Sequence, residues 1–249
     1  MRKPIIAGNW KLFKTIEESV KTVTDLKSKV SDVKDREIVV CPVFTCLKSV
    51  CDALKNSNIN VGGQDLFWEE KGAFTGEISA SQIKDTGCTY VIIGHSERRQ
   101  YFHETNETVG KKTLAALKAI LTPIVCVGET LAERESGKTF AVIDKQLRDG
   151  LGCLSKEQAG LIVIAYEPVW AIGTGKVATP AQAEEVHIYT RKTIANMFGQ
   201  DIADHIRILY GGSVKPDNVS DLMGQKNIDG ALVGGASLEA ESFAKIIKY

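Results

Sequence analysis

Residues 165–176 read Ala165-Tyr166-Glu167-Pro168-Val169-Trp170-Ala171-Ile172-Gly173-Thr174-Gly175-Lys176, and the rest of the chain is interpreted outward from this stretch. An apolar run, Leu161–Ala165, leads into it and is typical of a buried strand. Glu167 follows that run, and a glycine-containing loop separates it from Pro180, which suits the first turn of a helix. A carboxylate at a strand end beside a movable loop is what a proton-transfer site under a lid requires. Taken alone, the pattern fits an ordinary strand–loop–helix joint with a solvated glutamate equally well.

Length and composition limit the class of the protein. The chain has 249 residues, 43% of them hydrophobic and 25% charged, so it can bury a large core. Lys plus Arg and Asp plus Glu both number 31, and this balance gives no sign of nucleic acid or a membrane surface as a partner. No apolar run approaches the length of a membrane span.

The cysteines and the first residues bear on localisation. The six cysteines are scattered without a C-x-x-C pair, which argues against a zinc site. Met1–Pro4 leads straight into an expected strand and carries no signal-peptide pattern. We therefore expect reduced thiols and a cytoplasmic protein, rather than the disulfides that an even number of cysteines could also mean.

Short apolar runs alternate with longer amphipathic stretches along the whole sequence. The expected strands are Ile5–Ala7, Ile38–Cys41, Ile59–Gly62, Tyr90–Ile93, Ile124–Val127, Leu161–Ala165, Ile206–Tyr210 and Ala231–Val233. The expected helices between them, each with one apolar face, include Ile16–Val30, Val109–Ile120, Phe140–Leu151, Ala181–Phe198 and Phe243–Ile247.

This alternation predicts an α/β fold. Strand–helix units with nearly continuous hydrophobic strands indicate a parallel sheet that is buried on both faces. Eight such units match a closed eight-stranded parallel (β/α)8 barrel, and a doubly wound open sheet is the alternative. No linker or block of charge interrupts the sequence, so residues 1–249 are expected to form one domain. The longest non-helical connection, Gln64–Ile78, is expected to be functional.

In such barrels the active site forms where the strands end at their C-terminal face, so the residues after each strand are the candidates. These positions hold Asn9-Trp10-Lys11, Gly94-His95-Ser96-Glu97-Arg98-Arg99, Glu167 with its glycine loop, Gly211-Gly212-Ser213 and Gly234-Gly235. Together they supply a base, a histidine, a cation and glycine-rich turns whose backbone amides suit a phosphate group. A small phosphorylated substrate is therefore expected, and the histidines show no ligand spacing for a metal.

Each of these pieces also has a plainer interpretation. Lys11 alone reads as a surface lysine, His95 alone as a structural histidine, and the glycine pairs alone as turns. Arg98 is expected in a structural ion pair, and Cys126 in the core rather than as a nucleophile. Residues 173–176 do not complete a P-loop, because the first glycine and the Ser/Thr of that motif are missing. They do not form a dinucleotide turn either, because the glycines do not follow the strand tightly.

The chain carries six longer motifs in order. They are Gly8-Asn9-Trp10-Lys11, Gly72-Ala73-Phe74-Thr75-Gly76-Glu77, Gly94-His95-Ser96-Glu97-Arg98-Arg99, Tyr166–Lys176, Tyr210-Gly211-Gly212-Ser213-Val214 and Val233-Gly234-Gly235-Ala236-Ser237. With these motifs the chain resembles the triosephosphate isomerase family along its whole length.

The resemblance implies a TIM barrel and a glycolytic and gluconeogenic isomerase that uses no cofactor. It would interconvert dihydroxyacetone phosphate and D-glyceraldehyde 3-phosphate through an enediolate. Glu167 would be the base, and neutral His95 would act as an electrophile on the carbonyl oxygens, favoured by the positive end of a short helix after it. Lys11 would stabilise negative charge, and Asn9 would donate a hydrogen bond.

The resemblance also implies how the phosphate would be held. A lid formed by Pro168–Lys176 would close over it and exclude water. The backbone amides that would bind it belong to Gly173, Ser213, Gly234 and Gly235.

A homodimer is the last expectation from the resemblance. The Gln64–Ile78 loop would insert into the partner subunit, close to the residues that correspond to Asn9, Lys11 and His95. A loop folded back on its own barrel is the alternative. Two other functions compete with the isomerase: another phosphosugar barrel isomerase or lyase, and a non-catalytic barrel that binds phosphorylated metabolites or proteins.

Overall fold

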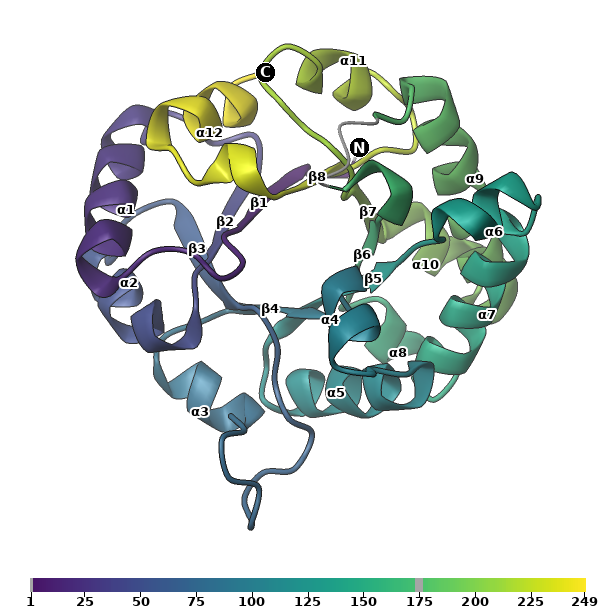
Figure 1. Ribbon diagram of the computed structural model, residues 1–249, viewed down its shortest axis with the longest axis horizontal. Coiled ribbons are helices and arrows are strands. Elements are labelled where there is room, and N and C mark those ends of the chain that lie inside the picture. Colours follow the sequence, from purple (N-terminus) through teal and green to yellow (C-terminus); the bar gives the residue numbers. More distant parts are fainter. Residues whose placement is uncertain (1, 173–176) are drawn as a thin grey trace.

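The computed structural model describes residues 2–172 and 177–249. Within these residues, eight parallel strands follow one another around a closed barrel, and β1 pairs with both β2 and β8 (Figure 1). The predicted closed barrel is therefore confirmed, and the doubly wound open sheet is wrong. The strands are β1 Ile5–Asn9, β2 Glu37–Cys41, β3 Ile59–Gly63, β4 Tyr90–Ile93, β5 Thr122–Val127, β6 Val163–Tyr166, β7 Arg207–Tyr210 and β8 Gly230–Val233.

Helices connect the strands and surround the barrel (Figure 1). The longer helices predicted from the sequence are present, with small shifts of their ends. The α-helices are α1 Ile16–Val30, α2 Leu47–Ala53, α3 Ala80–Asp85, α4 Ser96–Tyr101, α5 Asn106–Lys118, α6 Leu131–Glu135, α7 Thr139–Leu151, α8 Lys156–Ala159, α9 Pro180–Phe198, α10 Gln200–His205, α11 Val219–Met223 and α12 Ala240–Ile247. Short 3-10 helices are η1 Phe44–Cys46, η2 Val169–Ala171 and η3 Gly235–Ser237.

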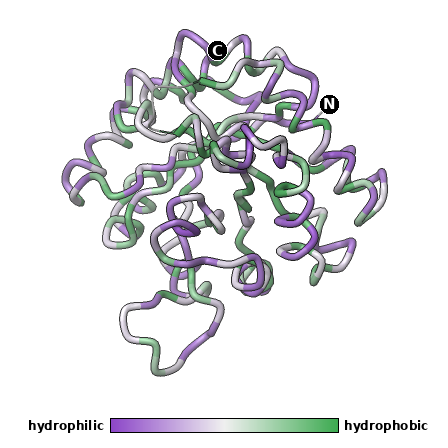
Figure 2. Tube along the Cα trace, turned by 45° about the vertical axis from the view of Figure 1, so that its right-hand side comes forward, coloured by the Kyte–Doolittle hydropathy of each residue, from purple (hydrophilic) through white to green (hydrophobic). Residues whose placement is uncertain are grey.

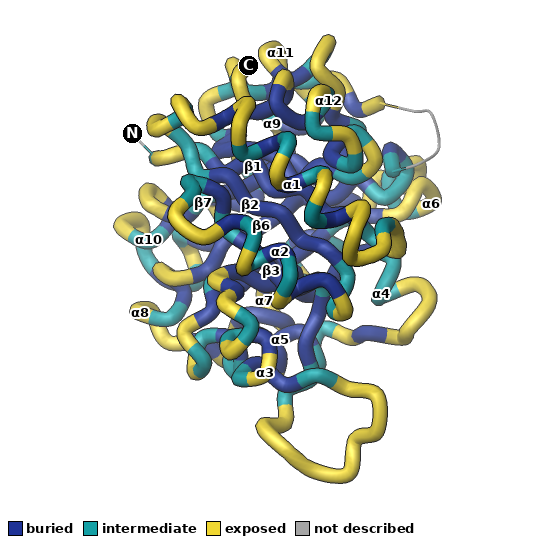
Figure 3. The backbone as a smooth tube through the Cα atoms, turned by 90° about the vertical axis from the view of Figure 1, so that its left-hand side faces the viewer, coloured by how far each residue is buried: buried dark blue, intermediate teal, exposed yellow. Residues whose placement is uncertain are grey.

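Side chains alternate along the strands between two hydrophobic clusters. In β4, Tyr90 and Ile92 belong to a small cluster that also takes alternate residues from most other strands, as expected for the barrel interior. Val91 and Ile93 belong to the larger cluster, which includes residues of the surrounding helices. Both faces of the sheet are therefore covered, and this explains the continuous hydrophobic runs of the sequence. Figure 3 shows the strands as the buried centre of the molecule.

Local sequence fixes where several helices begin. In the part of the chain that the structure describes, six helices start with a capping box. In this motif a Ser or Thr side chain accepts a hydrogen bond from the third helical amide, and the side chain of that third residue bonds back to the backbone of the capping residue. At α9 the capping residue Thr179 is followed by Pro180 at the start of the helix, as predicted. The end of the loop that follows β6 is therefore set by its own sequence.

The loop that contains Gln64–Ile78 projects away from the barrel (Figures 1 and 3). Its residues 69–77 are exposed, and it carries hydrophobic as well as hydrophilic segments (Figure 2). The ring of Phe74 packs on Phe67, with ring centroids 4.6 Å apart, and keeps 43% of its surface exposed. The tip is thus partly packed within the loop itself. No helix among the described residues is long and apolar enough to cross a membrane.

Candidate active site

The expected catalytic and substrate-binding residues that the structure describes line one cavity. Its volume is about 370 Å³, and it lies at the C-terminal ends of the barrel strands. Its lining includes Asn9, Lys11, His95, Glu167, Ser213, Gly234 and Gly235. Ile172, from the beginning of the expected lid, also lines it. The expected phosphate ligand Gly173 and the next lid residues, 174–176, lie outside the described residues.

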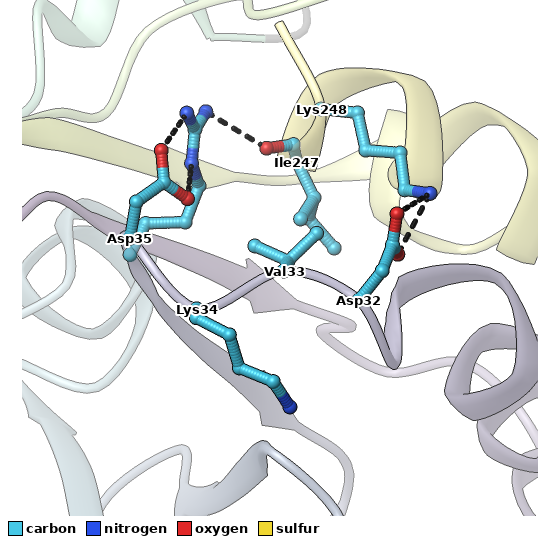
Figure 4. Close-up of a pocket in the computed structure, with 7 residues that line it drawn as sticks. Asp32, Val33, Lys34, Asp35, Ile247 and Lys248 are labelled. Atoms are coloured by element: carbon cyan, nitrogen blue, oxygen red, sulfur yellow. Dashed lines mark hydrogen bonds and ion pairs between the residues drawn. The ribbon is translucent and has the colours of Figure 1, made fainter.

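A more open cavity of about 470 Å³ lies between residues 32–36 and the end of α12 (Figure 4). Its charged side chains are largely paired with one another or with backbone. Lys248 Nζ lies 2.9 Å from Asp32 Oδ1, and Arg36 pairs with Asp35 and donates to the carbonyl of Ile247. These contacts hold the end of α12 beside the start of β2. Because these charged groups pair with one another or with backbone rather than face a common space, the candidate active site is the cavity at the strand ends.

Glu167 and His95 are in direct contact in that cavity, and both are nearly buried. Glu167 Oε1 lies 2.8 Å from His95 Nε2, and Glu167 Oε2 accepts a hydrogen bond of 2.9 Å from the backbone N–H of Ser96. His95 caps α4, and its Nδ1 accepts a 3.2 Å hydrogen bond from the backbone N–H of Glu97. Because Nδ1 is an acceptor, the ring proton of the neutral imidazole belongs on Nε2.

Burial and charge act in opposite directions on this pair. Burial favours neutral His95, but attraction to the Glu167 carboxylate outweighs it and raises the pKa of His95. Burial likewise opposes the charge on Glu167, but His95 prevails and lowers the pKa of that carboxyl. The neutral His95 that the resemblance implies rests on the positive helix end, which by itself would lower the pKa of the ring. The expectation is wrong for this arrangement, because the helix end after His95 is present but the carboxylate lies against Nε2.

Lys11 is held in a strained backbone conformation at the edge of the cavity. Its φ is +52°, in the left-handed region that residues other than glycine rarely adopt. Two contacts hold it there: its N–H donates to Asn9 Oδ1 at 3.0 Å, and Gln64 Nε2 donates to its carbonyl at 2.9 Å. Its Nζ lies 2.6 Å from Glu97 Oε1. This backbone places one ammonium group in the wall of the cavity.

Glycines keep the cavity open beside β7. A Cβ at Gly211 would lie 2.8 Å from Glu167 Cγ, and one at Gly212 would lie 2.2 Å from the hydroxyl oxygen of Tyr210. Neither position has room for a side chain. On the same side of the cavity, Gly234 leads into η3, so the wall there is largely backbone. Such a wall suits an anionic group bound by amides.

The first half of the expected lid is attached to β5 through Glu129, a residue that the sequence analysis missed. The buried Glu129 carboxylate accepts hydrogen bonds from Trp170 Nε1 at 2.9 Å and Tyr166 Oη at 3.1 Å. The backbone N–H of Val169 donates to the carbonyl of Glu129 at 3.1 Å. One carboxylate therefore fixes the residues on both sides of Glu167. Glu129 is a single acidic residue two positions after β5 and is not part of a recognisable motif. Its position just after a strand is the one sequence signal that could have identified it.

Two residues near the site are structural, as predicted. Arg98 Nε lies 2.8 Å from Asp65 Oδ2 and 3.1 Å from Glu104 Oε2, in a largely buried network that Lys112 completes. Cys126 is fully buried, and burial raises the pKa of its thiol well above the ordinary value.

A wide groove adjoins the candidate site and shares its wall. It has a volume of about 920 Å³, and Asn9, Lys11 and His95 line it as well. Several large apolar side chains beside it are exposed, among them Leu12 at 92% and Phe102 at 65%. Exposed apolar surface beside a groove is typical of interaction sites.

Comparison with known proteins agrees with the fold and identifies the family. The family model described as triosephosphate isomerase matches residues 4–249. The triosephosphate isomerase of Endomicrobium trichonymphae is 64% identical over 249 residues, which is 100% of this chain and 99% of that protein. That of Citrifermentans bemidjiense is 59% identical with the same coverage. A crystal structure of triosephosphate isomerase from Bartonella henselae has a TM-score of 0.89 at 41% identity and covers 98% of this chain and 97% of that one. The chain belongs to the triosephosphate isomerase family.

Proposed function

We propose that Glu167 is the base with which this chain interconverts dihydroxyacetone phosphate and D-glyceraldehyde 3-phosphate. The isomerase activity itself follows from the family. The observation that carries the assignment is the 2.8 Å contact between Glu167 Oε1 and His95 Nε2, inside a cavity that Lys11 also lines. A carboxylate, an imidazole and an ammonium group facing one small space suit proton transfer next to a carbonyl.

The proton transfer proposed for Glu167 requires it to exchange partners. Its oxygens now bond to His95 and to the backbone of Ser96. On binding, the carboxylate would leave both and take the proton from the carbon beside the carbonyl group, then return it to the neighbouring carbon. Gly211 does not obstruct the Glu167 side chain, whereas a Cβ at that position would lie 2.8 Å from Glu167 Cγ.

His95 and Lys11 are proposed to stabilise the enediolate. The Nε2–H of His95, released from Glu167, would donate to the oxygens that gain charge. The Lys11 ammonium, with Nζ 2.6 Å from Glu97, would attract the same negative charge, and Asn9 would donate from its amide group. No step requires a cofactor, since the electron pair of each broken C–H bond stays in the substrate and Glu167 carries the proton from one carbon to the next.

The phosphate is proposed to lie against the backbone wall beside β7 and β8. Ser213, Gly234 and Gly235 line the cavity there, and Gly173 would complete the site from the lid. The Glu129 contacts to Trp170 and Tyr166 support a fixed first hinge for that lid.

Glu167→Gln tests the assignment. The amide keeps the size of the side chain but cannot accept the proton, so isomerisation should fall by about 10²–10⁴-fold or more while binding of a substrate analogue persists. A coupled assay with D-glyceraldehyde 3-phosphate measures the rate, and Glu17→Gln, on the exposed side of α1, is the control. Turnover of the variant at the control rate would remove Glu167 as the base. An inactive parent that still binds the analogue would favour the non-catalytic barrel.

We also propose a homodimer in the cytoplasm. The Gln64–Ile78 loop would fill the groove of a second copy, whose wall contains Asn9, Lys11 and His95. The exposed apolar residues of the groove and of the projecting loop support this pairing. All six cysteines are free, in keeping with a reducing compartment.

A further inference from the structure

Two cysteines far from the candidate active site lie next to each other. Cys51 is on α2, and Cys88 is in the short segment between α3 and β4. Gly87 lies in the same segment and has a left-handed backbone conformation with φ +104°. A Cβ built on Gly87 would lie 3.3 Å from Cys51 Cβ and 3.4 Å from Cys51 Sγ, so this segment passes close to Cys51. The hydroxyl of Thr86 lies 3.2 Å from Cys88 Sγ and is also a hydrogen-bond partner of Cys51. The turn therefore brings both thiols to the same hydroxyl.

The two thiols differ in exposure and in acidity. Cys51 is partly exposed, whereas Cys88 is buried. A hydrogen bond from Cys88, opposed by burial, lowers the pKa of the Cys51 thiol. The reciprocal contact with Cys51, together with burial, raises the pKa of Cys88. An accessible thiol of lowered pKa beside a protonated second thiol is the arrangement of an attacking and a resolving cysteine.

The other cysteines do not share this arrangement. Cys41, Cys46 and Cys126 are buried. Cys153 is exposed, but burial of its sulfur raises the pKa of the thiol, and the sulfur lies 3.9 Å from the carbonyl oxygen of Gly150. The proposed dimer groove, which is lined by residues 43–45 among others, does not include Cys51.

We propose that Cys51 and Cys88 form a redox-active pair that a hydroperoxide converts into a reversible intramolecular disulfide. The Cys51 thiolate would attack the peroxide, so that an S–O bond forms, the O–O bond breaks, and the departing oxygen takes up a proton. The Cys88 thiol would then attack the sulfenic sulfur, an S–S bond would form, and its proton would leave with the hydroxyl group as water. Two thiols are thereby oxidised while the hydroperoxide is reduced to an alcohol and water.

The full-length protein, treated with hydrogen peroxide at low molar excess and then alkylated after denaturation, tests the proposal. Trypsin places Cys51 alone in residues 49–55 and Cys88 alone in residues 85–98. We expect two of the six thiols to escape alkylation, and a linked 49–55/85–98 peptide that a dithiol reductant releases. Six alkylated cysteines, or a linkage between other cysteines, would overturn the proposal.

Variants separate the two roles. In Cys88→Ser a dimedone adduct should accumulate on Cys51, because no resolving thiol remains. In Cys51→Ser neither the adduct nor the linked peptide should form at position 88. Cys153→Ser removes an exposed thiol elsewhere and should behave as the parent does. A Cys51→Ser protein in which Cys88 is still oxidised first would contradict the assignment of Cys51 as the attacking thiol.

Discussion

The pKa of His95 depends on where the Glu167 carboxylate lies. Burial disfavours the imidazolium, and Lys11 acts in the same direction, but contact with Glu167 at 2.8 Å reverses the outcome. We predict that Glu167→Gln lowers the pKa of His95, because it removes the charge and leaves burial and Lys11 in place. Nitrogen NMR of the imidazole during a pH titration measures the change. An unaltered or higher pKa in the variant would show that Glu167 does not determine the protonation of His95.

His187 on α9 should make the stability of the fold sensitive to acid. It is fully buried beside Tyr166, and burial lowers its pKa from 6.5 to about 3. Below pH 6.5 the His187 ring therefore binds a proton in the unfolded chain, whereas in the folded chain it stays neutral down to about pH 3. The contribution of the neutral ring to the free energy of unfolding is complete above pH 6.5 and is lost as the pH falls towards 3. At pH 5 the loss is about 2 kcal/mol.

We predict that His187→Gln reduces the loss of stability between pH 7 and pH 5 by about 2 kcal/mol, whatever its effect at pH 7. Urea unfolding at both pH values and one fixed protein concentration gives the difference. His205→Gln, which changes an exposed histidine on α10, is the matched control. If both variants lose stability with acid as the parent does, the His187 ring does not control the response.

At the scale of elements, the strands and long helices could be predicted because their apolar period is strong. The helix predicted from the sequence at Ile16–Val30 has the same bounds in the structure. Helices as short as α6 or α8 have too few turns to show a period, so the sequence did not reveal them individually. The candidate site could be predicted because strand ends of a barrel converge. Contacts between residues far apart in sequence, such as Glu129 with Trp170 or Glu167 with His95, depend on side-chain placement that no local pattern encodes.

The loop after β6, which contains the expected lid Pro168–Lys176, can be tested as an element by deletion. We predict that deleting Ile172–Gly175 leaves the barrel folded, because Ala171 and Ala178 on either side are buried and α9 begins at Pro180, beyond the deletion. The enediolate, no longer held in plane, should expel its phosphate, so methylglyoxal and inorganic phosphate should appear at the expense of isomerisation. Both products can be assayed directly. Trp170→Phe keeps the lid length while removing the indole N–H, and should give far less methylglyoxal. Clean isomerisation by the deletion variant at the parent rate would exclude the lid from the reaction.

At the scale of the whole molecule, the projecting loop and the groove suggest a complementary pair. The groove shares Asn9, Lys11 and His95 with the cavity of the candidate active site, so a segment that fills the groove would also support that wall. A two-fold axis would make the loop-to-groove contact twice, because an isologous interface uses the same surfaces on both subunits. Quaternary structure and the strained backbone of Lys11 would then be linked, since the filled groove lies against the Lys11 segment.

Thr75, exposed at the tip of the loop, tests this link. We predict that Thr75→Arg buries an unpaired charge in each of the two contacts, at a cost of about 3 kcal/mol or more apiece. The dimer dissociation constant should therefore rise by at least about 10²-fold for each contact, since 1.4 kcal/mol is about tenfold. Sedimentation velocity should show a dimer for the parent and mainly monomer for the variant, with much lower isomerase activity because the groove wall loses its support. Thr24→Arg, on the exposed face of α1, adds the same charge elsewhere and should remain dimeric and active. A monomeric parent of full activity, or a Thr75→Arg dimer with parent activity, would mean that the loop has another role.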